Sequence, residues 1–106
     1  MSDRLLYHLV SRAEWDLVGD VYRPASLATD GFIHFSTAEQ IAATSLRYYA
    51  GVADLLVLSV DPERADGEIR WEDLHGTGAF PHLYGALPRS AVLAVTTYVA
   101  GTLFED

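Results

Sequence analysis

Three of the four histidines lie in apolar segments of the chain: His8, His34 and His82. An imidazole changes charge near neutral pH, so it can transfer protons and bind ribose hydroxyls or phosphate oxygens. A buried polar atom without a partner costs about 1–3 kcal/mol, a cost that each of three separate core histidines would have to avoid. We therefore predict that the three side chains converge on one pocket. The alternative is that each is a core histidine with partners of its own.

Two of these histidines belong to short polar patterns. Strand alternation places His34 and Ser36 on one face of a strand, and His82 and Tyr84 on one face of another. Ser36 and Thr37 stand where a helix is expected to begin, so they cap that helix or hold an anion beside its free N–H groups. We expect Ser36 and Tyr84 to line the same pocket as the histidines.

Two charged residues complete the candidate site. Glu72, after Trp71 on a predicted strand, is either a base and acceptor for a ribose hydroxyl or a solvated strand residue. Arg23 lies in a predicted loop of residues 20–31, which we expect to border the cleft; its guanidinium can hold a phosphate through two parallel hydrogen bonds. The candidate catalytic residues are His34, His82 and Glu72. The candidate ligand-binding residues are His8, Arg23, Ser36, Thr37, Trp71 and Tyr84.

The composition excludes several classes of function. The chain has no cysteine and no lysine, which rules out disulfides, thiolate nucleophiles and Schiff-base chemistry. Seven scattered arginines and a net charge of −8 give no basic stripe for a nucleic-acid backbone. No apolar run is long enough for a bilayer, and the N-terminus lacks a signal-peptide pattern, so we expect a cytoplasmic protein with no membrane partner. Protein partners cannot be assigned from these features.

Hydrophobic periodicity and turn residues define the elements that must position these side chains. Two Ser-x-x-Glu capping boxes, at Ser11 and Ser36, predict two short helices, one over residues 12–18 and one ending at Gly51. This order predicts a single α+β domain over residues 1–106, with two short helices on a bent or split, mostly antiparallel sheet. The predicted strands cover residues 5–10, 32–35, 55–60, 69–72, 82–84 and 91–99.

Four blocks of the sequence form a familiar combination: Tyr-His-Leu at residues 7–9, Gly-Phe-Ile-His-Phe-Ser-Thr-Ala-Glu-Gln at 31–40, Arg-Trp-Glu at 70–72 and Phe-Pro-His-Leu-Tyr-Gly at 80–85. Together they resemble a family of small bacterial proteins classed as a domain of unknown function, over nearly the whole chain. That family is similar to a compact form of the ADP-ribosyltransferase fold, which binds NAD in a cleft between two halves of a split sheet.

The resemblance implies a role for each histidine. His8 falls on the first strand, and His34 stands in place of a tyrosine that packs on nicotinamide. His82, or Glu72 if the alignment shifts, takes the place of a glutamate that holds a ribose hydroxyl. A histidine does not replace a carboxylate that stabilises positive charge at the reacting carbon. The resemblance therefore supports a nucleotide-shaped cleft better than it supports transfer of ADP-ribose.

The function that follows is a cleft for NAD, ADP-ribose or a related nucleotide, in a divergent ADP-ribosyltransferase-like or glycosidic-bond-cleaving enzyme. NAD is then a candidate substrate, and no other cofactor is implied. One alternative is a non-catalytic module that binds a small molecule. Another is a histidine-ligated metal hydrolase, for which the signal is weak because no close pair such as His-x-His occurs.

Overall fold

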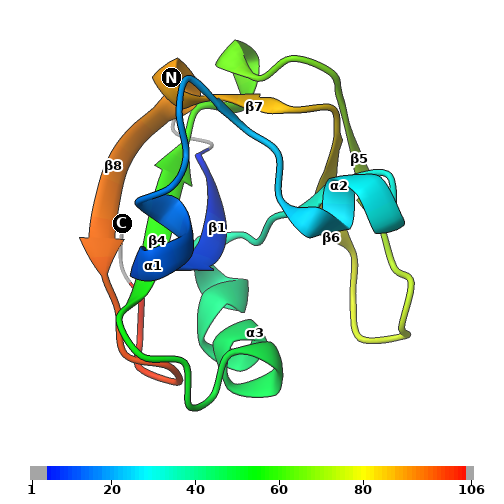
Figure 1. Cartoon of the computed structure of the whole chain (residues 1–106). Helices are drawn as coiled ribbons and strands as arrows, with labels where there is room; N and C mark the ends of the chain where they lie inside the picture. The colour runs from blue at the N-terminus through cyan, green and yellow to red at the C-terminus, as the bar shows by residue number, and fades with distance from the viewer. Residues whose placement is uncertain (1–4, 105–106) are drawn as a thin grey trace.

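The computed structural model describes residues 5–104, and within them the strands form separate antiparallel sheets (Figure 1). The first sheet has the order β1-β4-β8, in which β4 pairs with both neighbours. The apolar run at residues 55–60, predicted as a central strand, is this β4. The strands of this sheet are β1 (Leu6–Ser11), β4 (Leu55–Val60) and β8 (Val92–Thr97).

A second three-stranded sheet has the order β3-β6-β5, again with antiparallel pairs. A two-stranded ribbon of β2 and β7 forms a third, separate sheet. The second sheet consists of β3 (Ile33–His34), β6 (Phe80–Tyr84) and β5 (Glu68–Glu72), and the ribbon of β2 (Val21–Tyr22) and β7 (Leu87–Pro88). The predicted α+β class with split, antiparallel pairing is confirmed.

The helices are short, and one of them corrects the sequence prediction. The described residues contain α1 (Arg12–Trp15), α2 (Ala25–Thr29) and α3 (Ile41–Tyr48), besides single 3-10 turns at Ala38–Gln40, Pro62–Arg64 and Arg89–Ala91. Residues 20–31 were expected to be a loop, but they contain β2 and α2. Pro24 precedes α2, where its extended backbone starts the helix without a side-chain cap. No helix within residues 5–104 is long and apolar enough to cross a membrane.

The two predicted capping boxes have different outcomes. Ser11 caps α1 by accepting a hydrogen bond from the Glu14 N–H at 3.2 Å, as predicted. The second box is one residue later than predicted, at Thr37 and Gln40, where the Gln40 side chain accepts from the Thr37 N–H at 2.9 Å. Ser36 does not serve as that cap because its backbone is bonded to β1.

The two faces of β1 pack against different groups of apolar residues. Leu6 and Val10 belong to a core cluster with Leu56 and Leu58 of β4. Tyr7 and Leu9, on the opposite face, belong to a second cluster with Leu55, Val57 and Ile41. Ile41 is the first residue of α3, so this helix covers the second face of β1.

The two main sheets meet at one point, where β1 passes the end of β3. Tyr7 and Ser36 form an isolated antiparallel bridge, with N–H to O=C distances of 2.9 and 2.8 Å. An antiparallel ladder would next pair Leu9 with His34, two residues along each strand. That pair does not form, and the strands separate beyond the bridge. The sheet is therefore split beside Tyr7 and Ser36.

Two glycines, Gly67 and Gly85, allow the backbones of the β5–β6 hairpin to approach closely at its open end. A Cβ on Gly85 would lie 2.2 Å from the Asp66 carbonyl oxygen, and one on Gly67 would lie 2.4 Å from that of Tyr84. Gly67 also has a φ of +115°, which disfavours other residues. The glycine after Tyr84 thus permits close contact between two backbone segments next to the candidate site.

Candidate functional site

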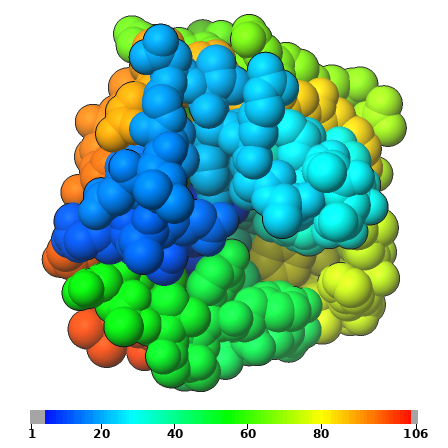
Figure 2. All heavy atoms as spheres, in the orientation of Figure 1, coloured from blue at the N-terminus to red at the C-terminus, as the bar shows by residue number. Residues whose placement is uncertain are grey.

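A pocket of about 410 Å³ opens beside the split in the sheet. Figure 2 shows the molecule hollowed between α2 in cyan, α3 in green and the yellow segment that follows β5. The pocket is lined by β1 and the end of β3 on one side, by α3 on another, and by β5, β6 and the segment between them. Small-molecule sites typically measure 300–1,000 Å³, so this pocket is at the small end of that range.

Strand alternation determines which candidate residues reach the pocket. Tyr7 and Leu9 face it from β1, and His34 and Ser36 face it from β3 and the residues after it. The predicted common face of His34 and Ser36 is therefore observed, and both side chains belong to the pocket wall. Ser36 is buried, whereas the His34 side chain is 49% exposed and its Nε2 lies 3.2 Å from Asp30 Oδ2.

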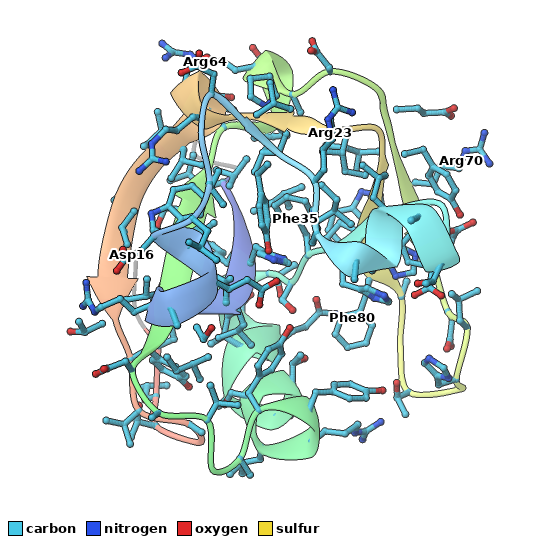
Figure 3. The ribbon with its side chains drawn as sticks, viewed as in Figure 1. Asp16, Arg23, Phe35, Arg64, Arg70 and Phe80 are labelled. Carbon is cyan, nitrogen blue, oxygen red and sulfur yellow. The ribbon has the colours of Figure 1, made fainter. Side chains whose placement is uncertain are left out.

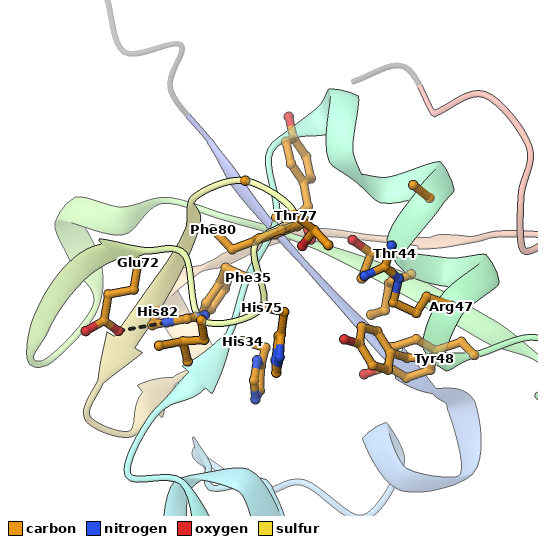
Figure 4. A pocket seen from close by; sticks show the side chains of 17 residues that line it. His34, Phe35, Thr44, Arg47, Tyr48, Glu72, His75, Thr77, Phe80 and His82 are labelled. Atoms are coloured by element: carbon orange, nitrogen blue, oxygen red, sulfur yellow. Dashed lines mark hydrogen bonds and ion pairs between the residues drawn. The ribbon is translucent and has the colours of Figure 1, made fainter.

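His82 and Glu72 form a hydrogen-bonded pair at the wall of this pocket. His82 Nδ1 lies 2.8 Å from Glu72 Oε1, and the His82 side chain is only 5% exposed (Figure 4). Tyr84 also donates its hydroxyl to Glu72 Oε1, at 2.7 Å. The predicted common face of His82 and Tyr84 is thus a shared partner, because both side chains reach the same carboxylate oxygen.

Electrostatics keep this carboxylate ionised. The hydrogen bonds from His82 and Tyr84 lower the pKa of Glu72, since each stabilises the negative charge. The same bond raises the pKa of the Tyr84 hydroxyl, whose proton is held by the carboxylate. Arg70 lies over the Tyr84 ring, 4.5 Å from its centroid. An ionised Glu72 accepts the Nδ1–H of His82, which leaves Nε2 as the nitrogen that can accept or give up a proton.

Aromatic contacts hold the His82 ring in place. Phe32 stacks on it with ring centroids 4.1 Å apart and planes 20° from parallel. His34, the cross-strand partner of His82, meets it edge-on at 5.3 Å between centroids. Nε2 of His82 makes no hydrogen bond to any residue in the described range 5–104. The ring is therefore fixed on three sides, with one nitrogen unpaired beside the pocket.

His8 lies on the other side of β1 and does not line the pocket, so the predicted convergence of three side chains is wrong for this residue. Its neighbours Tyr7 and Leu9 face the pocket, and alternation turns the His8 ring into the opposite core, against Tyr22 and Phe35. Its Nδ1–H donates to the His34 carbonyl at 2.6 Å, and its Nε2 accepts from the Tyr22 hydroxyl at 2.8 Å. Burial lowers the pKa of His8 to about 4.

The bond from His8 explains why the sheet splits here. In a continuing ladder the His34 carbonyl would accept from the backbone of Leu9. The His8 imidazole takes that carbonyl instead, so the backbone group stays satisfied while the strands separate. His8 thus shapes the site by holding the backbone of His34, and its ligand-binding role is not supported by its position.

The other predicted ligand-binding residues lie outside the pocket wall. Arg23 is exposed between β2 and α2, and Figure 3 shows it well away from the pocket residue Phe80. Trp71 is 54% exposed on β5. Thr37 takes part in the cap of the 3-10 turn before α3. Tyr84 reaches the site only through Glu72. Any contact of these four side chains with a ligand stays a prediction.

Sequence reasoning missed the wall formed by α3 and by the segment after β5. Thr44, Arg47 and Tyr48 line the pocket from one side of the helix, next to the stripe of the buried residues Ile41 and Ser45 (Figure 4). The spacing of three and four residues is the signal that could have revealed this face. His75, to which no role was assigned, also lines the pocket.

No three histidine, aspartate or glutamate side chains within residues 5–104 are grouped so that they could hold a metal ion. His34 and His82 are adjacent, but Glu72 lies behind His82 and is bonded to it (Figure 4). These side chains form a hydrogen-bonded carboxylate–histidine pair with a second histidine beside it.

Comparison of the sequence with models of known protein families shows the family to which the chain is related. Residues 9–95 match the family described as a protein of unknown function, DUF952. The chain belongs to the DUF952 family. This confirms the part of the sequence resemblance that pointed to a family of unknown function. A search of proteins with curated descriptions finds no match.

Solved structures of one protein, CC0527, have a fold similar to that of this chain. The crystal structure of CC0527 from Caulobacter crescentus is 36% identical to this chain, covers 88% of it and 84% of CC0527, and gives a TM-score of 0.78. A double mutant of CC0527 gives the same values. The solution NMR structure of CC0527, also 36% identical, gives a TM-score of 0.74.

Proposed function

We propose that the pocket binds NAD, ADP-ribose or a related nucleotide, and that His82 transfers a proton during cleavage of a glycosidic bond. The observation that carries this proposal is the Glu72–His82 pair, in which a carboxylate 2.8 Å from Nδ1 leaves Nε2 unpaired at the pocket wall. A histidine held by a carboxylate in this way has a defined tautomer and a stabilised imidazolium form, both useful to a general base.

The position of the pocket supports a nucleotide as the ligand. The ADP-ribosyltransferase resemblance implies NAD in a cleft between two halves of a split sheet. The pocket of this protein lies where β1 and β3 separate beyond the Tyr7–Ser36 bridge. His34, at the position of the tyrosine that packs on nicotinamide, presents a half-exposed ring at that place.

The resemblance left two candidates, His82 and Glu72, for the place of the glutamate that holds a ribose hydroxyl. In the structure these two residues form one hydrogen-bonded pair. His82 lies at the wall, and Glu72 is bonded to its far side (Figure 4). In this proposal His82 is the catalytic residue, and Glu72 is a positioning residue that holds the Nδ1 proton. Tyr84 keeps the carboxylate ionised by donating to the same oxygen.

The proposed reaction is hydrolysis of NAD to ADP-ribose and nicotinamide. The bond between C1′ of the ribose and the pyridinium nitrogen breaks, and its electron pair neutralises the nitrogen. The oxygen of a water molecule bonds to C1′ and loses a proton to His82 Nε2. The imidazolium then releases this proton to solvent. Atoms and charge balance, since NAD⁺ and water give ADP-ribose, nicotinamide and one proton.

A non-catalytic binding module is the second candidate, and one observation favours it. Glu72 is the only carboxylate among the described residues that line the pocket, and its Oε1 already accepts from both His82 and Tyr84. A carboxylate placed behind a histidine contributes little direct stabilisation to positive charge at a ribose carbon. Binding without turnover is the outcome that this arrangement would produce.

Calorimetry and nicotinamide release separate the two candidates. The wild-type protein is titrated with NAD, ADP-ribose and AMP, and NAD turnover is followed by chromatography of free nicotinamide. We expect binding, with turnover lowered by about 100-fold or more in Glu72→Gln, because the imidazolium loses its counter-charge. Glu68→Gln is the matched control, since Glu68 lies on the same strand, pairs with Arg70 and lies outside the pocket.

Each outcome decides between the candidates. Binding without release of nicotinamide by the wild type supports the binding module and contradicts the enzyme. Equal turnover by Glu72→Gln and the wild type contradicts the role of the pair. No binding of any of these nucleotides overturns the proposal as a whole.

A further inference from the structure

The residues that line the pocket are less acidic than the molecule as a whole. The chain has a net charge of −8, yet the described residues at the pocket wall include one arginine, three histidines and a single carboxylate. That carboxylate, Glu72, is occupied by its hydrogen bonds to His82 and Tyr84. A guanidinium in a pocket with no free carboxylate beside it can attract an anionic ligand to that place on an otherwise acidic protein.

Arg47 is the cation at this wall. It lies in the last turn of α3, is exposed, and makes no ion pair or hydrogen bond within the part of the chain that the structure describes. The arginines at 64, 70 and 89 differ, because each is bonded to a carboxylate or a carbonyl oxygen of this chain. Arg47 is therefore the pocket cation that is free to bind a ligand.

The neighbours of Arg47 can complete a binding site for an anion. Thr44 lies one helical turn before it on the same side of α3, and Thr77 lines the pocket from the segment after β5 (Figure 4). Hydroxyl groups beside a guanidinium are common donors to phosphate oxygens, and the planar guanidinium can bind two oxygens at once. Figure 4 shows this group on one side of the pocket and the Glu72–His82 pair on the other.

We infer that Arg47, with the hydroxyls of Thr44 and Thr77, binds a phosphate of the ligand, so that the pocket takes a phosphorylated nucleoside. This inference rests on the proposed function. It assigns the phosphate of the ligand to the end of the pocket that is farther from His82. The phosphate lies beside α3, and the rest of the ligand extends along the apolar wall toward His34 and His82. The pocket thus selects phosphorylated nucleosides over neutral nucleosides and free bases.

A basic residue near the C-terminus of a helix also stabilises the helix dipole, so the test must separate the two effects. Arg47→Lys keeps the charge and the dipole interaction but loses the two-oxygen contact. Arg47→Gln removes both. Arg12→Gln is the matched control, because Arg12 is likewise exposed on a helix, makes no ion pair or side-chain hydrogen bond within residues 5–104, and lies outside the pocket.

The probes are nicotinamide mononucleotide, nicotinamide riboside and inorganic pyrophosphate, measured by calorimetry and by NMR of the arginine Nε–Hε groups. We expect the wild type to bind the mononucleotide at least tenfold more tightly than the riboside. Arg47→Gln should lose that preference, Arg47→Lys should lose part of it, and Arg12→Gln should keep it. Binding should weaken as salt increases.

The outcomes distinguish this inference from the proposed function. If the mononucleotide binds Arg47→Gln as tightly as the wild type, the phosphate assignment is overturned and the nucleotide pocket stands. If neither nicotinamide ligand binds, the proposed function fails. In that case the test of the anion site is the titration with pyrophosphate. If pyrophosphate shifts an arginine Nε–Hε resonance of the wild type and this resonance is missing in Arg47→Gln, the anion site at Arg47 is supported. If pyrophosphate shifts no such resonance, the anion site is overturned.

Discussion

His8 and His82 are both buried histidines on strands, but their surroundings give them opposite properties. His8 uses both ring nitrogens inside the core, with a carbonyl on one side and a tyrosine hydroxyl on the other. His82 has a carboxylate on Nδ1 and no partner within residues 5–104 on Nε2. The first arrangement, enclosed in the core, disfavours a positive ring and lowers the pKa of His8 to about 4, whereas the second leaves one nitrogen without a protein partner beside the pocket. Burial alone therefore does not distinguish a histidine with both nitrogens bonded in the core from one with a nitrogen left for a ligand; the partners of the two nitrogens do.

The largest effect should come from removing the proton acceptor of the proposed reaction. We expect His82→Gln to lower nicotinamide release by about 100- to 10,000-fold, the usual contribution of a general acid or base. His75→Gln is the control, because His75 lines the same pocket and is exposed. Thermal unfolding of both variants shows whether the fold is retained. A folded His82→Gln variant with the wild-type rate would remove the chemical distinction between His82 and His8.

The second prediction concerns the contribution of His8 to the pH dependence of stability. Its pKa is about 4 in the folded protein and near 6.5 when unfolded. Between these values the unfolded chain binds a proton that the folded protein does not, so stability falls as pH decreases. The loss from His8 alone should be about 2 kcal/mol between pH 7.5 and pH 5.

Urea unfolding at several pH values measures the contribution of His8 to the free energy of unfolding. His8→Gln should unfold more easily at pH 7.5 but show a shallower decrease in the free energy of unfolding toward pH 5. The difference between the two curves isolates His8 from the carboxylates, which titrate in both proteins. Parallel curves would show that His8 titrates equally in the folded and unfolded states.

A smaller loss should follow from removing the partner of His8. Tyr22→Phe leaves Nε2 of His8 buried without a donor, and an unsatisfied buried acceptor costs about 1–3 kcal/mol. We expect about 1.5 kcal/mol, because the ring and its packing are retained. Tyr48→Phe is the control, since Tyr48 is 59% exposed. Equal stabilities of the two variants would show that the Tyr22–His8 bond is dispensable.

The smallest effect should follow the loss of one donor to Glu72. Tyr84→Phe removes a hydrogen bond that lowers the pKa of Glu72, so that pKa should rise toward its ordinary value. Stability should change less than in Tyr22→Phe, because the Tyr84–Glu72 bond is partly exposed to water. The acid limb of the pH–rate profile should move to higher pH. A profile unchanged in Tyr84→Phe would show that His82 alone sets the charge of this carboxylate.

The elements that sequence patterns predicted well are those with strong local signals. The strand at residues 55–60 has the predicted bounds, because a run of branched apolar residues between turn residues has few alternatives. The segment at residues 20–31 was predicted poorly. Its α2 is five residues long and has no side-chain cap, so it depends on its surroundings more than on propensity.

The sequence by itself determined the residue types at the site and the pairs that share a face. His34 with Ser36, and His82 with Tyr84, follow from the two-residue period of a strand. The absence of lysine and cysteine likewise leaves histidine, arginine and carboxylates as the available chemistry.

Tertiary structure alone decided which face of β1 lines the pocket. It also decided which residues of other elements complete the pocket wall. Because β1 is apolar on both faces, its pattern places His8 opposite Tyr7 and Leu9 but does not say which side is the core. The contact between Glu72 and His82, and the approach of Arg47 from α3, depend on how sheets and helix pack. These contacts form between residues that are far apart in the sequence. Local propensity does not indicate which of those residues lie close together in space.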